Sequence, residues 1–84
     1  MYITVKFYGN LKKYSPQKNE TAQMELNSDT TIRALLSRLG VPDTEVWMSA
    51  INDKVVDELS LLRDGDVLEV FEPVKGGKSS PLTI

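Results

Sequence analysis

The clearest helical signal in the chain is an apolar pattern near its middle. Four apolar residues recur there at the spacing of one helix face: Ile32, Leu35, Leu36 and Leu39. Residues 27–30, Asn-Ser-Asp-Thr, are types that cap helix N-termini. Gly40 stands where a left-handed C-terminal residue belongs, and Pro42 prevents an easy restart. The sequence therefore predicts one amphipathic helix of about ten residues.

On both sides of this helix, apolar residues follow the period-two alternation of strands with one buried face. Residues 2–8 place Ile3, Val5 and Phe7 on one side, and residues 22–26 alternate again, which predicts an antiparallel pair. Further strands are indicated after the helix at residues 46–51, 55–56 and 67–71. In the last of them, Leu68 and Val70 share one face.

The segments between these strands carry weaker signals. Residues 11–14 fit a short turn of helix, and Asp64-Gly65-Asp66 predicts a turn. Trp47 is expected wholly or partly in the core. Three leucines before the last strand are expected to be apolar anchors: Leu59, Leu61 and Leu62. Polar and aromatic residues after the first strand are expected on a solvated loop: Tyr8, Lys12, Lys13 and Tyr14.

The order of elements is strand, strand, helix, strand, short strand, strand. A helix packed on one face of a mixed sheet is an α+β arrangement, and a right-handed crossover through the helix lets the first and last strands lie side by side. This is the β-grasp, or ubiquitin-like, topology with one main helix. We expect a β-grasp domain over residues 1–74 and a flexible C-terminal tail containing Gly-Gly over residues 75–84.

The composition limits what the side chains can do. The chain has 84 residues, no Cys and no His. It therefore offers no thiolate nucleophile, no Cys–zinc site and no Ser–His triad. A domain of this size rarely encloses a pocket of several hundred Å³ beside its core. We expect a carrier or small subunit rather than an enzyme, with no bound metal.

Charge and targeting signals narrow the class further. The net charge of −2 argues against nucleic-acid binding. Residues 43–72 hold nine acids and two bases, either an ordinary solvated surface or an acidic face for a basic partner. The chain has no apolar run long enough for a membrane span and no signal-peptide pattern at its start. We expect a cytoplasmic protein without membrane contact.

Two consecutive glycines near the C-terminus carry the main functional signal. Gly76-Gly77 is common in linkers, but two residues without side chains also let an extended backbone thread a narrow channel. A backbone carboxylate can then reach another protein's active site without any side-chain nucleophile. Phe71 shares a strand face with Glu69, which predicts an exposed aromatic interface anchor beside the tail.

The chain resembles the MoaD/ThiS family of ubiquitin-like sulfur carriers up to Gly77. The resemblance rests on four stretches: residues 5–13, 31–36, 51–56 and 62–77. The last is the most specific, because a DGD turn, an apolar strand, Pro73, Val74 and Gly-Gly follow in the family's order. The first stretch, with the long gap before the second strand, looks more like the corresponding part of the molybdopterin-synthase small subunit than that of the thiazole-pathway carrier.

The resemblance implies a mechanism centred on the Gly77 carboxyl. An E1-like adenylating enzyme would activate it with ATP, no cofactor being bound by the chain itself, and a thiocarboxylate would form there. The carrier would then dock on a synthase large subunit and deliver sulfur for molybdopterin or tungstopterin biosynthesis. By analogy, Phe71, Pro73, Val74 and Lys75 would contact the partner, and Gly76 and Gly77 would enter its active site.

Two departures from the family pattern leave alternatives open. Residues 78–84 follow Gly77, so a peptidase must remove them before a carboxylate exists. Glu72 stands where molybdopterin-type carriers commonly have proline. The alternatives are a protein modifier conjugated through Gly77, a sulfur carrier for thiazole or amino-acid biosynthesis, and a non-catalytic β-grasp interaction domain.

Overall fold

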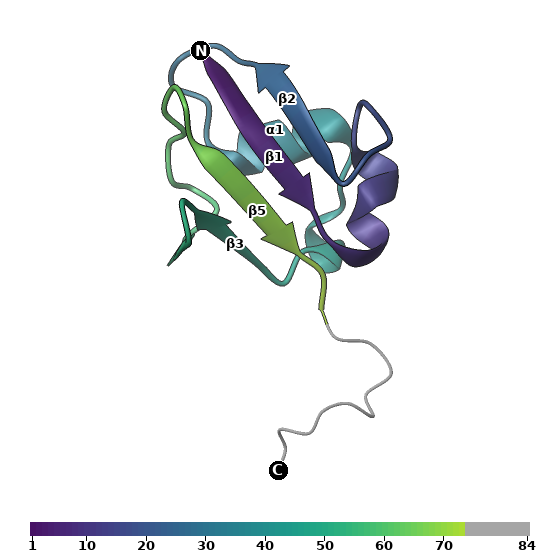
Figure 1. Cartoon of the computed structure of the whole chain (residues 1–84). Helices are drawn as coiled ribbons and strands as arrows, with labels where there is room; N and C mark the ends of the chain where they lie inside the picture. The colour runs from purple at the N-terminus through teal and green to yellow at the C-terminus, as the bar shows by residue number, and fades with distance from the viewer. Residues whose placement is uncertain (74–84) are drawn as a thin grey trace.

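The computed structural model describes residues 1–73, which form a mixed five-stranded sheet with one main helix on one face (Figure 1). The strand order is β2-β1-β5-β3-β4. The strands are β1 (Tyr2–Phe7), β2 (Thr21–Glu25), β3 (Met48–Ile51), β4 (Lys54–Val56) and β5 (Val67–Phe71). The helix is α1 (Ile32–Leu39), and two short 3₁₀ helices are η1 (Gly9–Tyr14) and η2 (Asp43–Glu45). The predicted α+β, β-grasp fold is confirmed.

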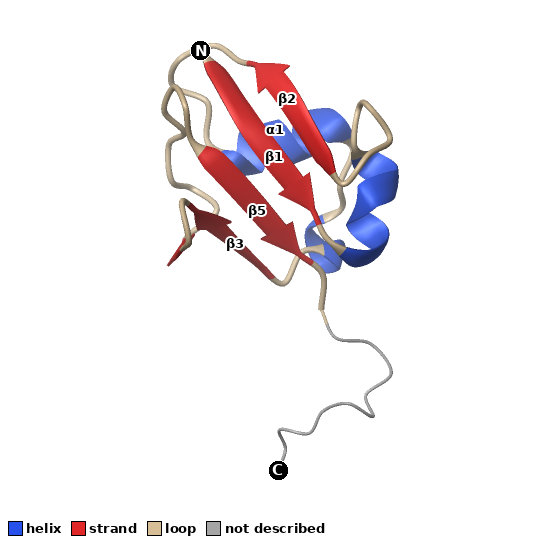
Figure 2. Cartoon of the chain, in the orientation of Figure 1, coloured by secondary structure: helices blue, strands red, loops and turns tan. Residues whose placement is uncertain are grey.

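The first and last strands lie side by side in the middle of the sheet, as the predicted crossover requires. β1 and β5 run parallel with Val5 opposite Leu68, while β1 and β2 run antiparallel with Val5 opposite Ala22. The helix lies behind these central strands (Figure 2). The N-terminal ammonium donates to the backbone oxygen of Leu26 at 2.7 Å, which ties the chain start to the sheet.

The ends of α1 are fixed by local chemistry. The Thr31 hydroxyl accepts a hydrogen bond from the backbone N–H of Ala34 at 3.1 Å, so Thr31 is the cap, one residue beyond the predicted cluster. Gly40 has φ +82°, the left-handed conformation that glycine adopts without a Cβ penalty. The helix therefore ends at Leu39 as predicted, with eight residues.

The core is a single layer between the sheet and α1. Every alternate residue of β1 contributes to it, together with Leu68 and Val70 of β5 and three residues of α1. These members are almost completely buried: Ile3, Val5, Phe7, Ile32, Leu35 and Leu36. The period-two and helical patterns of the sequence thus meet at one interface.

Two expectations about buried residues were wrong. Trp47 is 62% exposed, because η2 takes up the preceding residues and β3 begins only at Met48. Leu59 and Leu61 are 63% and 55% exposed, because the link after β4 bonds to α1 through its backbone. Leu62 alone of the three leucines is buried.

No helix within residues 1–73 has the length and apolar character needed to cross a membrane. The predicted tail over residues 75–84 lies outside the described residues, so the domain boundary stays a prediction.

Candidate functional site

The candidate site is the point where the chain leaves the sheet, and we call residues 71–73 (Phe71, Glu72 and Pro73) the tail root. Phe71 ends β5, and the two residues after it are half-buried. Of the predicted contact residues, the structure describes Phe71 and Pro73. The others lie outside the described residues: Val74, Lys75, Gly76 and Gly77.

Phe71 is not the freely exposed aromatic that was predicted. Its ring stacks on the ring of Tyr8, with centroids 4.9 Å apart and planes 15° from parallel. Tyr8 follows β1 directly, and its backbone N–H donates to the backbone oxygen of Val70. The parallel pairing of β1 and β5 therefore brings the two rings together, and the stack leaves Phe71 half-buried.

A hydrogen bond fixes the other end of the Tyr8 ring. The Tyr8 hydroxyl donates to Oε2 of Glu69 at 2.7 Å. This bond raises the pKa of Tyr8 to about 12, with smaller contributions from burial and from nearby acidic charges. Tyr8 thus stays a protonated donor at neutral pH, and Glu69 stays its acceptor.

Glu72 follows Phe71 and folds back over Gly9. A Cβ atom built on Gly9 would overlap the Glu72 carboxylate, and Gly9 has φ +62°. The left-handed backbone favours glycine here, and a larger residue would also force the Glu72 side chain to turn aside. Glu72, noted as a departure from the family's proline, is thereby held against the segment that follows β1.

On its other side the tail root is bordered by β3. The backbone N–H of Trp47 donates to the oxygen of Phe71 at 2.7 Å, and Met48 lies opposite Phe71 in the strand register. Residues opposite each other on paired strands share a sheet face, so Met48 and Phe71 both lie on the face away from α1. Phe71 is consequently held from both neighbouring strands.

The chemistry available at the tail root is positional. Within residues 1–73, no group of three His, Cys, Asp or Glu side chains is arranged to hold a metal ion. What the tail root provides is an end of β5 that is held by both neighbouring strands.

Sequence reasoning missed two contributors to the tail root. Tyr8 was expected on a solvated loop, yet it both stacks on Phe71 and bonds to Glu69. The contact between Gly9 and the Glu72 side chain was not predicted either. The available signal was the strand register: once β1 and β5 are parallel neighbours, the residue after β1 must lie beside the end of β5.

Comparison with protein families gives one match that covers most of the chain. The model of the ThiS family matches residues 5–77 and ends at the second glycine of the Gly-Gly pair. No curated protein sequence matches the chain significantly.

Solved structures share the fold. A chain from the complex of subunits 1 and 2 of molybdopterin-converting factor from Helicobacter pylori is 33% identical, with TM-score 0.56, covering 92% of this chain and 100% of that one. Small archaeal modifier protein 1 (SAMP1) from Haloferax volcanii has TM-score 0.70 at 18% identity, covering 92% and 100%. A putative molybdopterin converting factor subunit 1 from Pyrococcus furiosus has TM-score 0.68 at 23% identity, covering 88% and 99%.

Proposed function

The chain belongs to the ThiS family of small ubiquitin-like sulfur carriers, and from this premise we propose that it carries sulfur as a thiocarboxylate on Gly77. The acceptor we propose is the precursor of molybdopterin or tungstopterin. The observation that carries the proposal is the end of the family match at Gly77, seven residues before the end of the chain. A carrier of this kind needs a free carboxyl at that residue.

The proposed cycle begins with hydrolysis. A peptidase adds water across the Gly77–Lys78 amide bond, which leaves a Gly77 carboxylate and releases residues 78–84. An E1-like enzyme then joins this carboxylate to the α-phosphate of ATP, and pyrophosphate leaves. Hydrosulfide then attacks the acyl carbon, AMP leaves and a proton is released, which gives the thiocarboxylate. Adenylation is needed because a carboxylate is a poor electrophile without a good leaving group.

The tail root would serve as the docking surface in this cycle. Phe71 stacks on Tyr8, whose hydroxyl is held by Glu69, so little conformational entropy of the Phe71 side chain would be lost when a partner binds it. The relative from Helicobacter pylori was solved as a complex of subunits 1 and 2. By analogy, the partner that receives sulfur from this chain would be a synthase large subunit.

The test is intact-mass analysis of the full chain after exposure to extract of its own cells. We expect loss of residues 78–84, followed by a mass increase equal to the replacement of one oxygen by sulfur when ATP, the activating enzyme and a sulfur source are added. A Gly77→Ala variant of the same length is the control. It should show no mass increase if the reaction requires glycine at residue 77. A mature chain that is adenylated but recovered only as isopeptide adducts on lysines would instead identify a protein modifier. If the chain ending at Gly77 is never adenylated, the proposal fails.

A further inference from the structure

A crevice lies under the β3–β4 edge of the sheet, on the side that faces α1. It has a volume of about 280 Å³ and is lined by Asp43, Val46, Trp47, Ser49, Val56 and Asp57, among others. Ser49 lies opposite Val56 on one neighbouring strand and opposite the buried Val70 on the other. Its side chain therefore lies on the core-facing side of the sheet, at the inner end of the crevice.

Ser49 is an unusual residue for this position. It is 3% exposed, and none of the side-chain hydrogen bonds within residues 1–73 involves its hydroxyl. Buried polar groups are nearly always paired, and an unpaired one calls for an explanation such as a bound ligand. A hydroxyl at the bottom of an open crevice can accept a hydrogen bond from a group that enters it.

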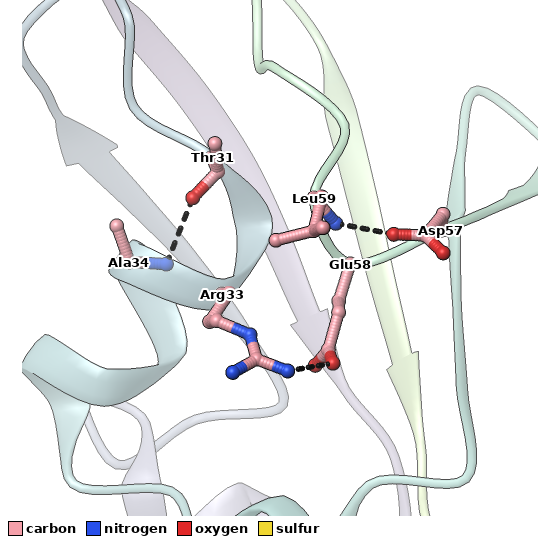
Figure 3. A network of polar contacts seen from close by, with 6 residues as sticks. All are labelled: Thr31, Arg33, Ala34, Asp57, Glu58 and Leu59. Atoms are coloured by element: carbon pink, nitrogen blue, oxygen red, sulfur yellow. Dashed lines mark hydrogen bonds and ion pairs between the residues drawn. The ribbon is translucent and has the colours of Figure 1, made fainter.

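The rim of the crevice carries excess negative charge. Asp43, Asp57 and Glu58 all line it. The Asp57 carboxylate accepts from the backbone N–H of Leu59, and one cation of the chain, Arg33, pairs with Glu58 from the first turn of α1 (Figure 3). The hydrogen bond to Glu58, and then the charges of Glu58 and Asp43, raise the pKa of Arg33 above its usual range. Three carboxylates thus face one guanidinium. The rim keeps a net negative charge, which can attract a second cation.

The remaining lining suits the stem of a long cationic side chain. Val46 and Val56 are apolar, and Trp47 is 62% exposed. A tryptophan ring attracts cations to its face and covers alkyl chains. The carboxylates are not arranged as metal ligands within residues 1–73, which favours an organic cation over a metal ion.

We propose that this crevice, with Ser49 at its inner end and Asp43, Asp57 and Glu58 at its rim, binds an arginine or lysine side chain of a partner protein. The cationic head enters the crevice and donates to the Ser49 hydroxyl, the carboxylates of the rim attract it from a greater distance, and the alkyl stem lies between Val56 and Trp47. The assignment rests on the crevice alone, so it stands or falls separately from sulfur transfer at Gly77.

The test is to titrate the full chain with n-butylguanidinium chloride and, separately, with n-butylammonium chloride at constant ionic strength. Amide NMR spectra recorded at each step report the binding. We expect saturable shifts at Ser49, Val56 and the Trp47 indole, and none with n-butanol, which has the same stem without the charge. The cation that binds with the higher affinity identifies the partner side chain, arginine for butylguanidinium and lysine for butylammonium. Absence of saturation with both cations would overturn the proposal.

Substitutions in and around the crevice should change its affinity for the cation in opposite directions. Asp43→Asn and Ser49→Ala should each weaken binding about two- to five-fold, the range for a partly exposed charge or hydrogen bond. Arg33→Gln should strengthen it by a similar factor, because the competing cation of the chain is removed. Glu25→Gln on β2 removes one negative charge elsewhere and should leave binding unchanged. The proposal is wrong if Glu25→Gln weakens binding as much as Asp43→Asn, because the attraction is then only that of the net charge. The same spectra report whether each variant is folded.

Discussion

Replacing Gly9 with alanine should destabilise the protein through two separable effects. Gly9 has φ +62°, and an alanine in the left-handed region is less stable by about 1–2 kcal/mol. Reduced freedom of the unfolded chain offsets this by about 0.4–1 kcal/mol. The new Cβ would also overlap the Glu72 carboxylate, and forcing that side chain out of its rotamer adds about 0.5–1.5 kcal/mol. The expected net loss for Gly9→Ala is about 0.5–3 kcal/mol.

A double-mutant cycle with Glu72→Ala separates the two effects. Glu72→Ala alone should change stability by less than about 0.5 kcal/mol, as most surface substitutions do. In its background Gly9→Ala should lose only the backbone contribution, about 1 kcal/mol, because the overlapping carboxylate is gone. The coupling energy between the positions should then be about 0.5–1.5 kcal/mol, above the deviation expected of independent sites.

The assay is urea unfolding followed by circular dichroism for the four proteins of the cycle. Gly40→Ala is the matched control, because Gly40 has φ +82° but no atom within 4 Å of an added Cβ. It should lose a similar backbone contribution and show no coupling to Glu72→Ala. If the Gly9 and Glu72 substitutions are additive, Glu72 does not lie against Gly9 in solution and the description of the tail root is wrong.

Three further predictions follow from the contacts described above. Tyr8 keeps its proton to about pH 12 in the folded state, against about pH 10 in the unfolded chain, so its hydrogen bond to Glu69 stabilises the fold fully below pH 10 and is lost as pH rises to 12. Urea unfolding across that range should show a steeper loss for the wild-type chain than for Tyr8→Phe, and equal slopes would contradict it. Thr31→Ala removes the cap on the N–H of Ala34 and should lower stability by about 1 kcal/mol, or Tm by about 4–8 °C, while Thr31→Ser should retain most of it. Phe71→Ala should weaken binding to the activating enzyme more than tenfold by calorimetry, as interface anchors do. It should lower stability by about 1.5–2.5 kcal/mol, through the lost stacking on Tyr8 and the lost area of a half-buried ring. Unchanged affinity would remove Phe71 from the interface.

The elements that could be predicted from the sequence are those whose signals are local. The helix is flanked by a cap and a glycine within its own segment, and the alternation in β1 and β5 marks their buried faces without reference to the rest of the chain. Combined with the handedness of crossovers, these local signals are enough for the topology.

What could not be predicted depends on which strands become neighbours, and where. The stacking of Tyr8 on Phe71 follows from a parallel register between segments at opposite ends of the sequence. Trp47 looked like a core residue by type, but its burial was decided by where β3 begins. The crevice at Ser49 likewise depends on how η2 and the link after β4 border the sheet. Local patterns carry none of this information.

The position of β5 also determines how the fold responds to mechanical force. β5 is bonded along its length to β1 on one side and to β3 on the other. A protease or unfoldase that grips residues beyond Phe71 pulls along the strand axis and loads both ladders in shear, so their hydrogen bonds must break together rather than one after another. A pull from this end of the chain therefore has to shear β5 from two neighbours at once, instead of peeling a strand from the edge of the sheet.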